Sequence, residues 1–469
     1  MALTDKLSAI GNAIRAKTGK EDLMTLEDMP AEIESISGGT SLPTQEKSIT
    51  ITENGTVEVL PDEGYALSKV TANAQVYDAV DDRFAKFIEG TSTEIYDPIA
   101  TSIRAYAFYK SPFTSVTLPN ATKGERYCLS NATSLKTISL EALKEAPYNM
   151  CTNLGNLETV SLPALTTIVG GEATYSYSMF EKCTSLRAVD MSSLVEIPYS
   201  SNGIFNSCTS LTSVHLPNLE TIAAGYTFKN CTALKSLELP KLKTIRGTRG
   251  ETFSGCTSLT SVYLPEYEGH TATTDITTKT FFGCTALTTV SFPKLIKGIG
   301  SYAFSGCTAL TDIDFPSYDD NITSNMFNGC TSLKNVNVAN CEGVQASAFD
   351  GCVSLEKLNP KITTSIGAKA FRGCSKLSII ALNGNYGNVV TLSNISAFEG
   401  TPFYSDGIGG ICLVPRDLIE SYQNATNWST LYAAGTCLFW ALEDYTVDGT
   451  IEGEIDWDKL NTDREGAFA

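Results

Sequence analysis

The sequence predicts a β-rich solenoid, a stack of short coils, over most of its 469 residues. Nearly the same stretch returns along the chain, as FSGCTSLTSVYLP at 253–265, FFGCTALTTVSFP at 281–293 and FSGCTALTDIDFP at 304–316. Apolar residues keep fixed offsets within each copy, and the copies recur at a near-constant interval. A period in the low twenties is typical of solenoids, in which one coil cannot bury its apolar face without its neighbours.

A cysteine marks each regular copy, in the frame Phe–x–x–Cys–x–x–Leu–x–x–φ–x–φ, where φ is apolar. Nine of the 14 cysteines follow it, at intervals of 22 to 28 residues: Cys183, Cys208, Cys231, Cys256, Cys284, Cys307, Cys330, Cys352 and Cys374. Because stacked coils lie about 4.8 Å apart, we expect a buried ladder of reduced thiols beside a ladder of phenylalanines. Disulfides between neighbouring coils stay an alternative. A metal site is disfavoured because no Cys-x-x-Cys pair and no adjacent histidine occur.

The second half of the frame predicts a short strand. In one copy Leu259, Val262 and Leu264 give the L-x-x-L-x-L core of a leucine-rich repeat. The alternation sends Val262 and Leu264 inward and Tyr263 outward, and Pro265 ends the strand because it has no N–H to donate. Less regular copies extend the array to about twelve or thirteen coils, so we assign the solenoid to residues 81–411.

Three segments flank this array. Residues 1–38 predict a helical attachment segment, since apolar residues from Leu3 to Ile14 recur at helical spacing. Residues 39–80 predict a small β module, in which ENGT joins two strands as a hairpin and a third strand follows. Residues 412–469 predict a cap, with a helix that holds Tyr422 and Trp428, and then an acidic tail. For that tail a solvated segment is favoured over a calcium site, because no complete calcium loop is present.

Composition excludes several functions. The net charge of −18 argues against nucleic acid and against attachment to an anionic membrane. No apolar run is long enough to insert into a membrane, and the charged N-terminus does not read as a signal peptide. There is no G-x-S-x-G or Walker A motif, and GIGSYA at 298–303 is the ordinary turn of a repeat. We therefore expect no cofactor and no enzymatic activity, with glycoside hydrolysis by outward carboxylates as a disfavoured alternative.

Recognition of a ligand fits the repeat better. The outward strand position varies from coil to coil while its apolar neighbours do not, and it reads Asp190, His215, Glu238, Tyr263, Ser291, Asp314, Asn337 and Asn359. Two longer intervals add loops at 169–178, with Tyr175 and Tyr177, and at 266–278. Aromatics among polar side chains suit a sugar or a protein surface. The alternatives are that any solvent-facing row is polar, and that the two loop tyrosines pack on their own coil.

The repeat pattern AFxGCTSLTSVxLP resembles the BspA-like leucine-rich repeats of bacterial surface proteins. LTDKLSAIGNAIRAKTG and QEKSITITENGTVEVLPDEGY, within residues 1–76, resemble N-terminal attachment modules of tail and virion proteins from bacteriophages of Gram-positive gut bacteria. Together the resemblances imply a phage tail or baseplate-associated protein, located in the virion. Its solenoid would bind a host cell-surface glycan or protein, and residues 1–76 would join other virion proteins, as part of a homo-oligomer. The alternative is a BspA-like adhesin on the bacterial cell surface.

Overall fold

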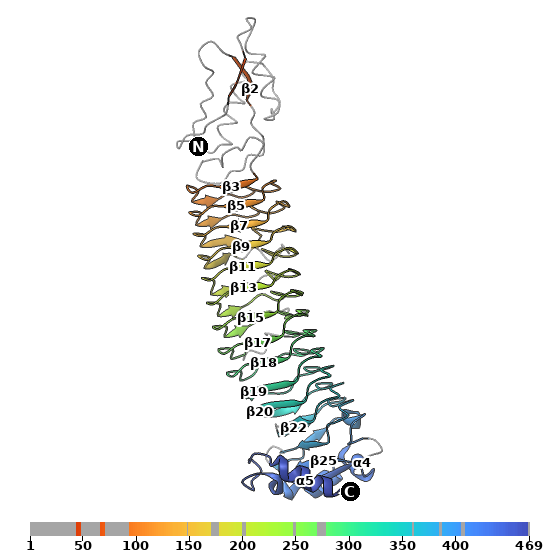
Figure 1. The fold of residues 1–469 in the computed structure, drawn as a ribbon. Coiled ribbons are helices and arrows are strands. Elements are labelled where there is room, and N and C mark those ends of the chain that lie inside the picture. Colours follow the sequence, from red (N-terminus) through yellow and green to blue (C-terminus); the bar gives the residue numbers. More distant parts are fainter. Residues whose placement is uncertain are drawn as a thin grey trace.

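The computed structural model describes residues 44–47, 66–70 and 93–467, apart from 148, 170–177, 199–202, 247–249, 270–277, 359–360, 384–386 and 405–408. Figure 1 shows residues 93 onward as a rod of stacked coils that ends in a helical cap. The predicted solenoid is confirmed. One apolar cluster runs through it from Ile95 to Phe439 without interruption.

Each coil contributes a short strand to one side of the rod. These strands form two parallel sheets, and the first is six-stranded: β3 (Glu94–Tyr96), β5 (Ser115–Thr117), β7 (Thr137–Ser139), β9 (Thr159–Ser161), β11 (Ala188–Asp190) and β13 (Ser213–His215). The second continues with β15 (Ser236–Glu238), β17 (Ser261–Tyr263), β18 (Thr289–Ser291), β19 (Asp312–Asp319), β20 (Asn335–Val344) and β21 (Lys357–Leu358). The central side chains of the three-residue strands are buried, as the alternation predicts, except Val214 in β13, which is partly buried.

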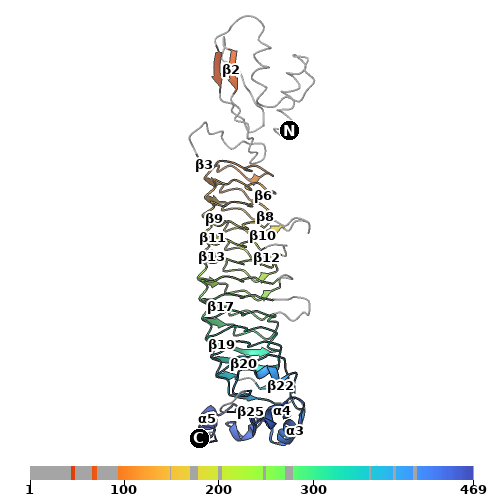
Figure 2. The same ribbon diagram turned by 90° about the vertical axis from the view of Figure 1, so that its right-hand side faces the viewer.

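A second, less regular column of strands closes the coils on another side of the rod. It consists of β4 (Ser102–Ile103), β6 (Lys123–Gly124), β8 (Glu145–Pro147), β10 (Thr167–Val169), β12 (Glu196–Ile197), β14 (Thr221–Ile222), β16 (Thr244–Ile245), β22 (Ile362–Ile366) and β24 (Thr391–Leu392). Figure 2 shows the two columns, with β9, β11 and β13 along one side and β8, β10 and β12 along the other.

Phenylalanines stack along the third side of the core, one from each coil. From Phe180 to Phe398 neighbouring rings lie nearly parallel, with centroids 5.2 to 5.7 Å apart. In an earlier, irregular coil Leu129 takes the same position: its N–H donates to the Met150 carbonyl of the next coil, as those of the phenylalanines do. A planar ring suits this position because it can stack at the spacing the backbone imposes.

The in-frame cysteines line the core beside these rings. All 14 cysteines are free and buried. From Cys208 to Cys374 each in-frame thiol donates a hydrogen bond to the backbone carbonyl of the preceding coil's phenylalanine; Cys256, for example, bonds Phe228 at 3.1 Å. Cysteine therefore does more than fill space: its weak donor links adjacent coils from an apolar position.

The turn around each phenylalanine needs a left-handed backbone, which accounts for the Gly–Cys pairs of the later coils. Gly306 has a φ of 76° and Gly329 one of 73°. In earlier coils the same position holds larger residues in the same conformation, such as Ser207 with a φ of 62°. Glycine removes the steric cost of that conformation.

We expect the thiols to be unreactive in the folded protein. Burial raises the pKa of Cys183, Cys256 and Cys341 to about 12, so almost no thiolate forms at neutral pH. A maleimide should therefore modify few of the nine in-frame thiols before unfolding, and all of them in urea. Rapid labelling of most of these cysteines in the native protein would contradict the buried ladder.

The C-terminal cap covers the last coil. After β23 (Ile379–Ala381) the chain forms β25 (Gly410–Val414), α3 (Ile419–Asn424), α4 (Trp428–Ala433), β26 (Cys437–Ala441) and α5 (Trp457–Ala467), with short 3-10 turns at Ile395–Phe398, Arg416–Leu418 and Leu442–Tyr445. β23, β25 and β26 form a three-stranded parallel sheet. Tyr422 and Trp428 are buried in the cap beneath the last coil.

The acidic tail is not a solvated segment, and that prediction was wrong. Thr446 and Ile455 form an antiparallel bridge, which closes a hairpin around Asp448. Ile455 and Leu460 are buried in a second, small apolar cluster with Leu442. The tail is therefore part of the cap.

The N-terminal predictions are mostly untested. β1 (Thr44–Lys47) and β2 (Ala66–Val70) pair in parallel. The expected ENGT hairpin and the helical segment 1–38 lie outside the described residues, so the β module stays a prediction.

Candidate binding face and cap pocket

The outward positions of the first strand column form one continuous polar surface, which we call the strand face. Its central row consists of Tyr96, Thr117, Ser139, Ser161, Asp190, His215, Glu238, Tyr263, Ser291, Asp314 and Asn337. Strand register aligns these residues: Asp190 lies opposite His215, and Tyr263 lies between Glu238 and Ser291. Ser291, Asp314 and Asn337 follow in the same alignment. The two parallel sheets meet between β13 and β15, which are adjacent in the stack (Figure 1).

The strand face is accessible and mixed in chemistry. Tyr263 is 60% exposed and Tyr96 is 69% exposed, unusually high values for tyrosines. Asp314 accepts a hydrogen bond from the Asn337 amide at 2.7 Å, and the parallel pair Asp312 and Asn335 does the same at 2.6 Å. These two pairs align carboxylates and amides of neighbouring coils on the strand face, where such groups can accept and donate hydrogen bonds to a ligand.

The structure brings five of the predicted site residues onto this face: Asp190, His215, Glu238, Tyr263 and Asp314. Tyr175 and Tyr177, in the loop at 169–178, lie outside the described residues, as do Asn359 and most of the 266–278 loop. Sequence reasoning missed Tyr96, which occupies the same row one coil before the first recognisable repeat. The signal was present, since EIY at 94–96 has the strand's alternation, but no Phe–x–x–Cys precedes it.

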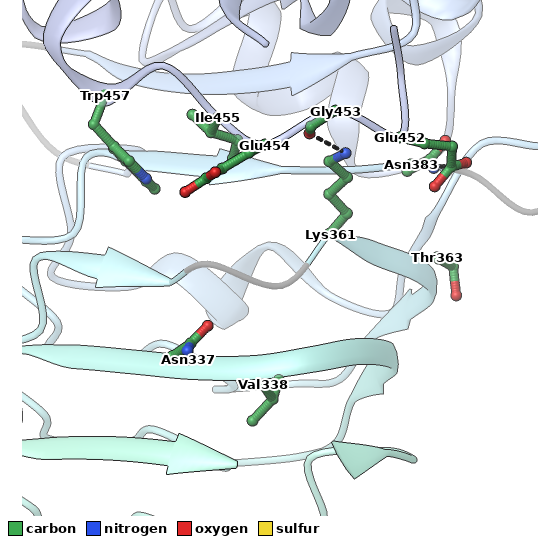
Figure 3. A pocket seen from close by; sticks show the side chains of 10 residues that line it. All are labelled: Asn337, Val338, Lys361, Thr363, Asn383, Glu452, Gly453, Glu454, Ile455 and Trp457. Carbon is green, nitrogen blue, oxygen red and sulfur yellow. Dashed lines mark hydrogen bonds between the residues drawn. The ribbon is translucent and has the colours of Figure 1, made fainter. Parts of the chain in front are cut away.

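A pocket at the cap was also missed. A cavity of about 350 Å³ lies where the strand face meets the tail. In Figure 3 the tail residues Glu454 and Trp457 lie above Asn337 of β20, with Lys361 at a level between them. The cavity is lined by Asn337, Val338, Lys361, Thr363, Asn383, Glu452, Gly453, Glu454, Ile455 and Trp457. These residues come from four separate stretches of the chain, so no local sequence pattern marks the site.

Lys361 fixes the tail to the coils. Its ammonium donates a hydrogen bond to the Gly453 carbonyl at 2.7 Å (Figure 3) and another to the Ile451 carbonyl at 2.5 Å. Partial burial lowers the pKa of Lys361, and the two carbonyls compensate for lost hydration. Beside it the Asn383 amide donates to Glu452 at 3.0 Å. The pocket wall is thus held by charge-assisted and amide hydrogen bonds rather than by apolar packing alone.

The described residues show no sign of a metal centre. No group of three or more histidines, cysteines or carboxylates is placed to hold an ion within the part of the chain that the structure describes. In the same residues no helix combines the length and the apolar character needed to span a bilayer.

Comparison with known proteins gives the family. The model of the BspA type leucine-rich repeat region matches residues 63–179, 173–274 and 249–378, about two thirds of the chain. No curated protein matches the chain.

Among solved structures, a leucine-rich repeat protein from Bacteroides ovatus is 21% identical with a TM-score of 0.48, over 78% of this chain and 100% of its own. A leucine-rich cell surface protein from Faecalibacterium prausnitzii is 22% identical with a TM-score of 0.33, over 65% and 81%. The pneumococcal vaccine antigen PcpA is 15% identical with a TM-score of 0.34, over 86% and 89%. Similarity this low carries no argument about function. The family assignment therefore depends on the match of the repeats to the family model. With its regular copies matched in three overlapping blocks, the chain belongs to the BspA-type leucine-rich repeat family.

Proposed function

We propose that this protein is a non-catalytic recognition protein, displayed at an outer surface, whose strand face binds a cell-surface glycan. The observation that carries the proposal is the in-register outward row, which keeps Tyr96 and Tyr263 exposed among carboxylates, a histidine and amides. Side chains on this row can vary without disturbing the buried ladders, so binding specificity can be placed there at little cost to stability. An exposed aromatic ring beside hydrogen-bonding groups suits a sugar ring.

Two features favour binding over catalysis. Burial raises the pKa values of the thiols in the ladder, which makes them poor nucleophiles. The acidic groups of the row lie on an exposed strand surface, whereas glycoside hydrolysis needs a pair of carboxylates on either side of the bond that is cleaved. Membership of the BspA-type family, whose repeats resemble those of bacterial surface proteins, favours an adhesin on a bacterial cell surface.

A role in a phage tail is the second candidate. It depends on the resemblance of residues 1–76 to virion attachment modules, and it would add virion partners and a homo-oligomer to the same recognition function. Mass spectrometry of purified virions separates the two candidates: the phage reading expects the protein in the particle, and the adhesin reading expects it in the cell-surface fraction.

Binding of the full chain to immobilised surface polysaccharide tests the proposal. We expect saturable binding that soluble polysaccharide competes away and that leaves the polymer's chain length unchanged. Absence of binding to both intact cells and their polysaccharide would refute the recognition function. Shortening of the polymer would refute the non-catalytic assignment.

A further inference from the structure

The cap pocket continues the strand face rather than standing apart from it. Asn337 is at once the last described member of the outward row and a wall of the cavity. A linear polymer lying along the row therefore reaches the pocket at the C-terminal end of the stack. There the tail residues from Glu452 to Trp457 join the coils in lining the cavity (Figure 3).

The groups in the pocket select a class of ligand. Trp457 is half-buried, and the Lys357 ammonium lies 5.5 Å from its ring centroid, which helps to fix the indole. Glu452 and Glu454 are exposed at the rim. The lining itself carries two carboxylates and one ammonium, that of Lys361, which is bonded to backbone carbonyls. Outside the lining, the carboxylate of Asp448 acts on Lys361 and offsets the Lys357 ammonium. The local charge is therefore negative, which disfavours anions. Nucleotides, phosphates and uronic acids are thereby disfavoured.

Size narrows the choice further. Ligand pockets span about 300–1,000 Å³, and at about 350 Å³ this one lies at the small end of that range. An aromatic ring, two amides and two carboxylates around a small space suit a pyranose, whose C–H face packs on an aromatic ring while its hydroxyls donate to carboxylate and amide oxygens. The lysine is already engaged by the tail and serves to hold the wall.

We propose that the cap pocket binds one uncharged pyranose unit of a glycan, stacked on Trp457 and hydrogen-bonded through Glu454 and Asn383. The inference rests on the proposed glycan recognition and names its subsite: the strand face would contact the polymer's length, and the pocket would take a single ring. Binding in the pocket requires the C-terminal cap, whereas binding along the strand face does not. Binding in the pocket can also be measured with a monosaccharide.

Ligand-observed NMR on the full chain tests the pocket, with galactose, mannose, N-acetylglucosamine and glucuronate as probes. At least one uncharged sugar should bind with a Kd on the order of 1 mM, and glucuronate should bind at least tenfold more weakly. Trp457→Ala should abolish the signal and Glu454→Gln should weaken binding several-fold. Trp457→Phe, which keeps an aromatic ring, should retain part of the affinity, so that a loss in Trp457→Ala is not mistaken for misfolding.

Trp440→Ala is the matched control. Trp440 packs against the same small cluster as Trp457 but does not line the cavity, so its loss should leave sugar binding unchanged. Failure of all three uncharged sugars to bind, or equal binding by wild type and Trp457→Ala, would overturn the pocket assignment. Polysaccharide binding that survives Trp457→Ala while no monosaccharide binds would refute the pocket alone. A monosaccharide that binds at Trp457 without any polysaccharide binding would uphold the pocket and refute recognition along the strand face.

Discussion

Replacing Phe304 by alanine should lower the free energy of unfolding by about 3–5 kcal/mol. The ring is 1% exposed and lies between Phe281 and Phe327, with centroids 5.4 and 5.5 Å away. Hydrogen bonds between coils fix the spacing of the backbones on either side of the ring. The Phe304 N–H donates to the Met326 carbonyl, and the Cys330 thiol donates to the Phe304 carbonyl. The space left by the ring therefore cannot collapse, and the cavity adds to the lost burial.

Urea unfolding followed by circular dichroism measures this effect. Tyr263→Ala is the control, because it removes an aromatic ring of similar size from the exposed row of a nearby coil, and it should change stability by less than about 0.5 kcal/mol. Loss of less than about 1 kcal/mol in Phe304→Ala would show that the phenylalanine ladder does not stabilise the stack as described.

Trp428→Ala should be as destabilising, by about 3–5 kcal/mol, and should also expose the end of the stack. Trp428 is fully buried, its indole N–H donates to the Val390 carbonyl at 2.8 Å, and its ring lies 5.8 Å from Phe398, the last ring of the ladder. The Tyr422 hydroxyl accepts from the Val390 N–H at 2.9 Å. Without the indole, one buried carbonyl loses its partner and the last coil loses its cover.

Thermal unfolding with light scattering tests this prediction. Exposed strand edges pair with other chains. The Trp428→Ala variant should therefore unfold at a lower temperature than wild type and should self-associate, which raises light scattering. Tyr432 lies on the same helix α4 and is 40% exposed, so Tyr432→Ala should scatter no more light than wild type and should melt at nearly the wild-type midpoint. Unchanged melting and no association in Trp428→Ala would mean that the stack does not depend on the cap.

Much of the fold can be predicted from the sequence because the same pattern of buried and exposed positions recurs in every regular repeat. The offsets of phenylalanine, cysteine and leucine predict the ladders, and the two-residue alternation predicts which side chains face outward. Asp190, His215, Glu238, Tyr263 and Asp314 fall on the strand face for that reason. The hydrogen bond from each cysteine to the preceding coil could not be predicted, since it depends on where a thiol lies relative to a carbonyl more than 20 residues away.

The cap pocket and the folded tail were beyond sequence reasoning for a related reason. Lys361 contacts a carbonyl 90 residues later in the chain, and neither segment repeats. The tail reads as acidic and solvated because its few apolar residues, such as Ile455 and Leu460, follow no period. Their burial is decided by a partner surface that the remainder of the cap supplies.

The central claim is that ligands bind on the strand face, and a comparison of two four-residue variants tests it most directly. One variant changes His215, Glu238, Tyr263 and Asp314 to serine. The other changes Glu220, Thr244, Glu268 and Ile296 to serine, on the second strand column of the same part of the stack. Each removes two carboxylates and no buried core side chain, so net charge and stability change alike.

The measurement is the Kd of each full-length variant for surface polysaccharide. The account predicts that the strand-face variant binds at least tenfold more weakly than wild type, a loss of about 1.4 kcal/mol or more, while the second-column variant binds as wild type does. Equal affinity of the strand-face variant and wild type, or a loss confined to the second-column variant, would contradict it.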